Sequence, residues 1–267
     1  MKSSKGLVKA FIITLAVALL AVAFIVLNLM GIINLGFGGA SKTARTEGKG
    51  YNSPEECMEA YMEYMKNGDY QGMLSCYAIE SAVEHYDMEA YIERLTCIAP
   101  TFTLVSKSDE FSTKLSADML RGSVAKDIRY GTWNLYGSTL FTDGLVVSLE
   151  DNDAKDLIEE YIPSDLAECL SGIKYKGIVD EDDDIIADYV SSDNLKDNIK
   201  EYKKMYGADE YQPMIADFSL DHDDYYFFGD CIEYDGKWYL CPTNRFWSSL
   251  FGITTYEGYI TLQENVY

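Results

Sequence analysis

Histidine is nearly absent from this chain of 267 residues, in which His85 and His222 are the only two. The side chain that most often acts as a general base or a metal ligand is therefore scarce, and a solvated or capping role is the favoured interpretation of each. The sequence also lacks a G-x-S-x-G nucleophile elbow, a P-loop, a dinucleotide-binding glycine fingerprint and an H-E-x-x-H helix. We therefore predict no catalytic and no cofactor-binding residue.

Basic side chains are also few, with 22 Lys and Arg against 44 Asp and Glu. The first 50 residues contain six of the basic residues and one of the acidic ones, so nearly all of the negative charge lies in residues 51–267. Phosphate backbones would repel such a domain, which excludes nucleic acid as a partner. Divalent cations and basic proteins remain compatible ligands, although the charge also serves simply to keep an exposed protein soluble.

N-glycosylation sites are absent after residue 50, because no asparagine there has Ser or Thr two positions later. This disfavours a glycosylated eukaryotic ectodomain and favours a bacterial envelope protein. The six cysteines are Cys57, Cys76, Cys97, Cys169, Cys231 and Cys241. No pair of them has the close double spacing of a zinc site. Their even number permits three disulfides, and buried free thiols are an equally open interpretation.

One long hydrophobic run is present, over residues 10–33. As a helix it would span about 36 Å, enough to cross a hydrocarbon core of about 30 Å. Lys2, Lys5 and Lys9 precede it and favour a cytoplasmic N-terminus. A signal peptide cleaved near Ala40 is the alternative, but the apolar part of such peptides usually runs only about 7–15 residues.

These features predict four parts of the chain. Residues 1–9 form a cytoplasmic stub, 10–33 a transmembrane signal anchor, 34–52 a flexible tether rich in Gly, Ser, Thr and Lys, and 53–267 an acidic α+β ectodomain. The expected location is therefore a single-pass protein of the cell membrane with its ectodomain outside the cytoplasm.

Helices are predicted first in the ectodomain. Ser53, Pro54 and Glu56 combine an N-cap, a first-turn proline and a capping box, and Asn67-Gly68 ends the helix. Further helices are expected after Asp69 and Asp87 and over residues 192–206. The pattern between 101 and 174 is mixed, and there we place helices near 113–121, 154–161 and 165–170.

After Gly207 the hydrophobic period changes from about 3.6 to 2, which predicts an antiparallel meander with strands over 214–220, 225–234 and 237–241. A three-residue loop over 235–237 would place Cys231 opposite Cys241, making them a disulfide candidate. A two-residue Asp-Gly loop would put them out of register. Residues 244–251 are expected to form a last packing element.

Two of these motifs resemble a known fold family. The helix opening Ser53-Pro54-Glu55-Glu56, with its end at Lys66-Asn67-Gly68, resembles the start of nuclear-transport-factor-2-like (cystatin-like) extracytoplasmic domains of membrane-anchored bacterial proteins. The segment 234–240 resembles their final hairpin. The resemblance implies an α+β cone, with helices packed on a curved antiparallel sheet. The two motifs are further apart than in a compact domain of about 120 residues, which implies an insertion around 105–190 or a different α+β fold with similar ends.

Clustered acidic residues are the only candidate metal ligands. Asp180, Asp182 and Asp184 lie in one cluster, and Asp221 and Asp223 lie in the predicted turn beside His222. Carboxylates suit Ca²⁺, but neither cluster follows the EF-hand loop. A solvated loop is the favoured interpretation, and Ca²⁺ the possible cofactor.

The expected function is a membrane-anchored extracytoplasmic binding or scaffolding module of the cell envelope, with an envelope protein or a small ligand as partner. The alternative is an enzyme with a small-molecule pocket in the cone, where the resemblance would place an Asp, His or Tyr dyad. Large aromatic residues, 22 of them tyrosines, load both faces of the predicted meander, and core packing is their favoured role.

The anchor can be tested by membrane extraction. We expect the full-length chain to stay in the membrane pellet at alkaline pH, because moving residues 10–33 into water would expose a long apolar helix. The Leu19→Glu/Leu20→Glu variant should be released, since charged residues at a helix centre cost about 2.5–3.5 kcal/mol each on insertion. Glutamates at exposed positions of the ectodomain provide the matched control. Release of the unaltered chain would contradict a spanning segment.

Overall fold

The computed structural model describes residues 45–95, 109–140, 164–179, 193–243 and 259–265. The chain divides into two compact units, Met1–Arg45 and Thr46–Tyr267, and the first contributes only Arg45 to the described residues. Within the described ranges, no helix is long and apolar enough to cross a membrane. The predicted anchor at 10–33 lies outside those ranges, as do the predicted helix at 154–161 and the predicted packing element at 244–251.

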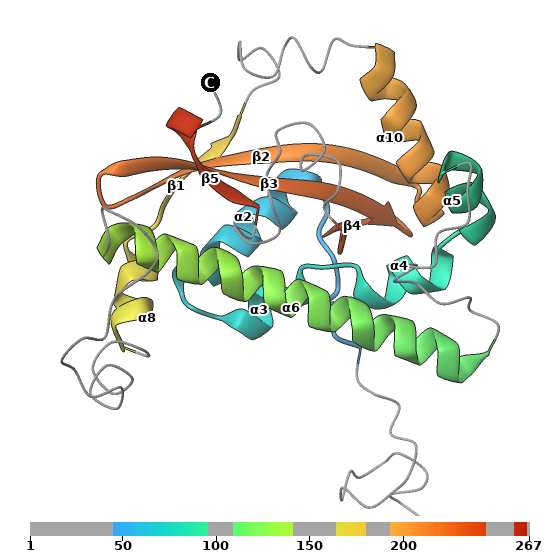
Figure 1. The fold of residues 1–267 in the computed structure, drawn as a ribbon, viewed down its shortest axis with the longest axis horizontal. Helices are drawn as coiled ribbons and strands as arrows, with labels where there is room; N and C mark the ends of the chain where they lie inside the picture. Colours follow the sequence, from blue (N-terminus) through green and yellow to red (C-terminus); the bar gives the residue numbers. More distant parts are fainter. Residues whose placement is uncertain (1–44, 96–108, 141–163, 180–192, 244–258, 266–267) are drawn as a thin grey trace, which may run out of the picture. The chain divides into compact units, whose positions relative to one another are not determined.

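The second unit is an α+β fold around a curved antiparallel sheet (Figure 1). Its strands are β1 (Lys174–Ile178), β2 (Glu210–Leu220), β3 (Asp223–Tyr234), β4 (Lys237–Leu240) and β5 (Ile260–Leu262). The order is β1-β2-β3-β4, and β5 also pairs with β3. Residues 231–234 of β3 pair with β4, whereas residues 225–227 pair with β5. Two short strands therefore share one edge of the longest strand.

The described helices are α2 (Pro54–Lys66), α3 (Tyr70–Ser75), α4 (Ile79–His85), α5 (Met88–Leu95), α6 (Glu110–Leu140), α8 (Ser164–Ser171) and α10 (Asp193–Tyr206), with a 3₁₀ turn, η2, over Gln263–Asn265. Helix α2 packs against β1, β2, β3 and β4, and α10 packs against β2 and α5. Helix α6 lies against α3, α4 and α8 (Figure 1). The sheet, α2 and α6 are thus connected through successive helix contacts.

Local capping chemistry explains where α2 and α3 begin. The Ser53 Oγ accepts from the Glu56 backbone N–H at 3.2 Å, and Pro54 occupies the first turn, where a missing N–H costs nothing. The Asp69 carboxylate accepts from the Gly72 N–H at 2.8 Å. The predicted helix starts at Ser53 and Asp69 are therefore confirmed.

The predicted short helix near 113–121 is corrected to the 31-residue helix α6. Its buried face continues through Leu120, Val124, Ile128 and Leu135, which pack into the core. Apolar side chains also lie on its exposed face, so the sequence has no clean amphipathic period there. Burial against α3, α4 and α8, rather than local propensity, sets the length of this helix.

The region 105–190, for which an insertion or a different α+β fold was predicted, contributes structural elements of the fold. Strand β1 pairs with β2 from Lys174 to Ile178 and forms one edge of the sheet. Helix α8 covers the predicted 165–170 helix. The described parts of this region are therefore packed into the domain.

The meander of β2, β3 and β4 is confirmed, and its last turn has two residues. Asp235 and Gly236 have φ of 53° and 71°, as a type I′ turn requires, and Tyr234 pairs with Lys237. Cys231 is therefore opposite Leu240. The disulfide candidate Cys231–Cys241 is out of register, and both thiols are free.

Two glycines in the left-handed region offer a matched test of how α10 docks. Gly207 and Gly68 have φ of 56° and 64°; a Cβ on Gly207 would overlap the His85 carbonyl oxygen, whereas a Cβ on Gly68 would meet nothing within 4 Å. We expect Gly68→Ala to cost about 1 kcal/mol through backbone strain alone. Gly207→Ala should cost about 1–3 kcal/mol more through the clash. Urea unfolding of both variants measures the difference, and equal losses would contradict the close approach of α10 to α4.

Candidate functional site

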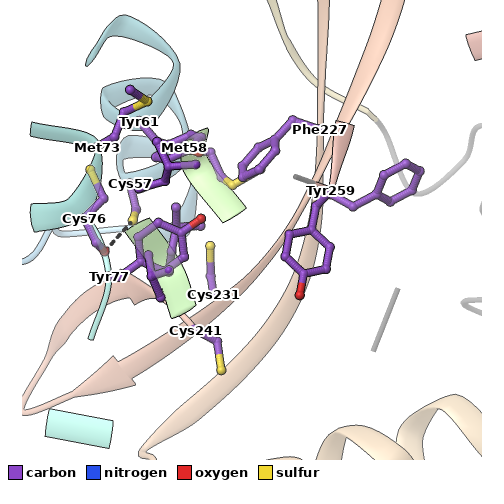
Figure 2. Close-up of a cluster of buried hydrophobic side chains, with 14 of the residues drawn as sticks. Cys57, Met58, Tyr61, Met73, Cys76, Tyr77, Phe227, Cys231, Cys241 and Tyr259 are labelled. Carbon is purple, nitrogen blue, oxygen red and sulfur yellow. Dashed lines mark hydrogen bonds between the residues drawn. The ribbon is translucent and has the colours of Figure 1, made fainter. Parts of the chain in front are cut away.

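The space between α2 and the sheet is filled by buried sulfur-containing and aromatic side chains (Figure 2). Tyr61 of α2 stacks on Phe227 of β3, with ring centroids 4.6 Å apart. Met58 lies over Gly229, where an added Cβ would come within 2.7 Å of its sulfur. Cys57 and Cys231 are fully buried in the same layer. These side chains are part of the hydrophobic core of the domain.

One ionisable cluster lies beside this core. The rings of Tyr61 and Tyr77 meet edge to face, with centroids 5.8 Å apart. Asp127 of α6 is close enough for its negative charge to raise the pKa of both hydroxyl groups, although burial is the larger cause. The cluster thus joins two tyrosines of the N-terminal helical block to one acid of α6.

Asp127 is the unusual acid of this cluster. Burial raises the pKa of its carboxyl group to about 6, and the Lys126 ammonium, 3.5 Å from Oδ1, opposes the rise. The same Oδ1 accepts no hydrogen bond within the described residues. A carboxyl group with such a pKa can exchange protons near neutral pH. A purely structural role, in which the positive charge of Lys126 compensates the buried negative charge of Asp127, accounts equally well for the arrangement.

A second polar cluster lies where α10 meets the sheet. The Tyr211 hydroxyl donates to the fully buried Asp230 carboxylate at 2.5 Å, a length typical of a charge-assisted bond. The Tyr234 hydroxyl donates to the Tyr206 carbonyl at 2.9 Å. Burial and the nearby Asp230 charge raise the pKa of Cys241 to about 12. That thiol is therefore not a ready nucleophile at neutral pH.

The two histidines have no catalytic arrangement within the described residues. His85 ends α4, with its Nδ1 2.9 Å from the Ser81 carbonyl oxygen, and its ring stacks on Tyr234 at 4.8 Å. His222 is in the β2–β3 turn with 94% of its side chain exposed, and its Nε2 lies 3.7 Å from Asp221 Oδ1. Both fit the capping and solvated roles predicted for them.

The predicted metal ligands do not converge in the part of the chain that is described. Asp221 and Asp223 are exposed in the β2–β3 turn, and the neighbouring Asp224 carboxylate is paired with Lys176. No group of three potential ligands occurs in the described ranges. Asp180, Asp182 and Asp184 fall outside them.

An exposed apolar stripe on α6 was missed by the sequence reasoning. Phe111, Leu115 and Met119 are 75%, 40% and 44% exposed. They recur at i, i+4 and i+8, so they line one side of the helix. Asp109, Glu110, Lys114 and Asp118 are exposed beside them, and Asp118 pairs with Arg121. The spacing was visible in the sequence, but without the helix boundaries it was indistinguishable from a buried stripe.

Comparisons with known proteins give little further information. No protein-family model matches the sequence, and no curated protein matches it. Among solved structures, the chain is similar to a cystatin-like protein from Ruminococcus gnavus ATCC 29149, at 11% identity and a TM-score of 0.44. The match covers 70% of this chain and 39% of that one. The architecture given above therefore stands on this chain's own strand pairing.

Asp127 predicts a pH dependence of stability. Its folded-state pKa of about 6 exceeds the ordinary value of about 3.9. The folded state therefore binds the proton more tightly, and its contribution, full below pH 4, is lost as the pH rises through 6. We expect Asp127→Asn to stabilise the protein by about 1–3 kcal/mol at pH 7.5 and by much less at pH 4.5. Urea unfolding at both values measures this effect.

The matched control is Asp197→Asn, at an exposed position of α10. It should change the unfolding free energy by under about 0.5 kcal/mol at either pH. A loss of stability in Asp127→Asn at pH 7.5 would show instead that the ionised carboxylate makes a favourable contact that Asn cannot replace.

Proposed function

We propose that this chain is a non-catalytic binding module of the cell envelope, anchored by residues 10–33 and carrying a nuclear-transport-factor-2-like (cystatin-like) ectodomain. The observation that supports it best is the filled interior between α2 and the sheet. A small-molecule enzyme of this shape would need that space for its substrate, yet Met58, Tyr61 and Phe227 are fully buried within it.

The chemistry of the buried ionisable groups points the same way. Cys241 is held as a neutral thiol with a pKa of about 12. Asp127 is beside Lys126 on the same helix. Tyr61 and Tyr77 are in ring contact, and burial raises the pKa of both hydroxyl groups. Burial thus keeps the Tyr61, Tyr77 and Cys241 side chains neutral at pH 7, as expected for groups in a structural core.

The binding surface proposed here is the stripe of Phe111, Leu115 and Met119 on α6. The opposite face of the helix is packed into the domain, and Arg121 fixes it further by pairing with Glu80 at 2.9 Å. The stripe is therefore presented on a rigid support, which lowers the entropic cost of binding.

Charge indicates the kind of partner. The chain carries a net charge of −22, and the acidic side chains of Asp109, Glu110 and Asp118 flank the stripe. A protein surface with apolar side chains surrounded by lysine and arginine would match both features. An anionic lipid surface would be repelled. We therefore assign the stripe to a basic envelope protein.

Crosslinking in cells tests this assignment. We expect wild-type chain to recover a basic protein that dissociates as salt is raised. The Phe111→Ser/Leu115→Ser/Met119→Ser variant should recover at least tenfold less, because interface anchors commonly contribute 1–2 kcal/mol or more each. The matched control is Lys196→Ser/Lys200→Ser, at exposed positions of α10, which should recover as much as wild type.

Three outcomes would contradict the assignment. Equal recovery by the stripe variant would remove α6 as the binding surface. Stripe-dependent binding to phosphatidylcholine vesicles would identify a membrane surface instead. Stripe-dependent dimerisation of the purified chain would identify a second copy as the occupant.

A further inference from the structure

Methionine side chains are mostly buried in the described part of this protein. Ten methionines occur in the sequence, and all except Met1 and Met30 lie in the described ranges. Met88 is half-buried and packs against the hydrophobic core. Met119 of α6 is the most exposed of the described methionines, at 44%. The core itself contains Met58, Met62, Met65, Met73, Met205 and Met214.

The neighbours of Met119 on α6 leave its thioether open to solvent. Residues three and four positions apart are neighbours on a helix surface. In the C-terminal direction these are Gly122, where an added Cβ would meet none of the described atoms within 4 Å, and the exposed Ser123. In the N-terminal direction Leu115 is itself 40% exposed. Small reagents in the surrounding solution can therefore reach the Met119 sulfur.

We propose that Met119 is a reversible oxidation site that regulates binding at the α6 stripe. Its regulatory effect rests on the function proposed above, in which Phe111, Leu115 and Met119 contact a basic envelope protein. The oxidant is a peroxide, with hydrogen peroxide as the simplest case. A sulfur lone pair attacks one peroxide oxygen and forms the S–O bond while the O–O bond breaks. The proton on the transferred oxygen passes to the departing hydroxide, and water leaves.

This reaction changes the polarity of the stripe. The sulfur loses two electrons and becomes a sulfoxide, whereas the peroxide is reduced to water. A thioether is apolar, but a sulfoxide oxygen is a polar hydrogen-bond acceptor. Apolar partner atoms packed over Met119 would leave that oxygen without a donor, which weakens binding.

The free chain tolerates the change because Met119 is outside the core. The helix is packed through its other face, where Leu120 and Val124 are buried. The sulfoxide oxygen therefore stays in water until a partner covers it. Methionine sulfoxide reductases reverse the change: two thiols are oxidised to a disulfide, the oxygen leaves as water and the thioether is restored.

The other described sulfur groups are protected from the same oxidant. Peroxide reaches a core methionine only when the fold opens locally. Cysteines react as thiolates, and burial holds the pKa of Cys57 well above its usual range and raises that of Cys241 to about 12. Both are therefore neutral thiols at pH 7, and the exposed thioether of Met119 is the favoured target.

Site-resolved mass spectrometry tests the oxidation site. The full-length chain in mild detergent is treated with millimolar hydrogen peroxide at pH 7, digested and analysed over time. We expect Met119 to gain about 16 Da at least about tenfold faster than the six core methionines, with Met88 between them. The two epimer-specific sulfoxide reductases with dithiothreitol should remove the added mass. Oxidation of Met119 no faster than that of the core methionines would overturn the site.

Crosslinking in cells tests the regulation. Peroxide added before the crosslinker should lower the amount of basic protein recovered by the wild-type chain about fivefold or more. Whatever the untreated recovery of Met119→Leu, peroxide should leave it unchanged, because the reactive sulfur is gone. The matched control is Met88→Leu, outside the stripe, which should lose recovery on peroxide treatment as wild type does. Equal losses in Met119→Leu and wild type would overturn the regulation, since oxidation elsewhere would then be the cause.

The oxidation site and the proposed function can fail separately. A wild-type chain that recovers no stripe-dependent partner from untreated cells would overturn the proposed function. The mass measurement uses the purified chain alone and needs no partner, so selective oxidation of Met119 would still support the site. Selective oxidation with unchanged recovery of the basic protein would overturn the regulation and leave the binding surface in place.

Discussion

The packing of α2 on the face of the sheet is the contact on which the rest of the domain depends. It joins the start of the second unit to strands that come more than 150 residues later, at 210–240. Gly229 makes it possible, because any side chain there would meet Met58 and Leu240. Tyr61 then stacks on Phe227. The close approach therefore rests on one missing side chain and one pair of rings.

The short edge strand β4 is secured by the same N-terminal block. Tyr51 pairs with Trp238 in both directions at 2.9 Å, and the Leu240 backbone bonds to Cys76 and Ala78. These bonds satisfy groups that an exposed edge would leave open to another chain. The helical block thus covers one face of the sheet and also closes part of its edge.

Side chains fill the space between α2 and the sheet, and the binding site proposed above is on the surface of the domain. Helix α6 presents its apolar stripe on that surface, and the opposite face of the helix is packed into the domain. The acidic composition selects among partners for such a surface, since it disfavours anionic polymers and lipids. Binding to a basic protein is consistent with both the packing and the charge.

Local chemistry made part of this architecture readable from the sequence. Ser53 and Asp69 fixed helix starts through side-chain bonds to nearby N–H groups, and the change of period after Gly207 identified the meander. These signals act within a few residues, so they hold whatever the rest of the chain does. The α+β class followed from them.

The tertiary structure decided what depends on distant segments. The length of α6 reflects burial against α3, α4 and α8, and β1 became a strand because the edge of β2 was available to it. The Asp235-Gly236 turn set the register that separates Cys231 from Cys241, a difference of one residue that moves a side chain to the other face. The contact of the Cys231 sulfur with the Pro54 carbonyl oxygen arises only because α2 lies on the sheet. By itself the sequence determined the composition, the charge and the long apolar run, since these do not depend on folding, whereas the side chains that meet in the core were fixed by packing.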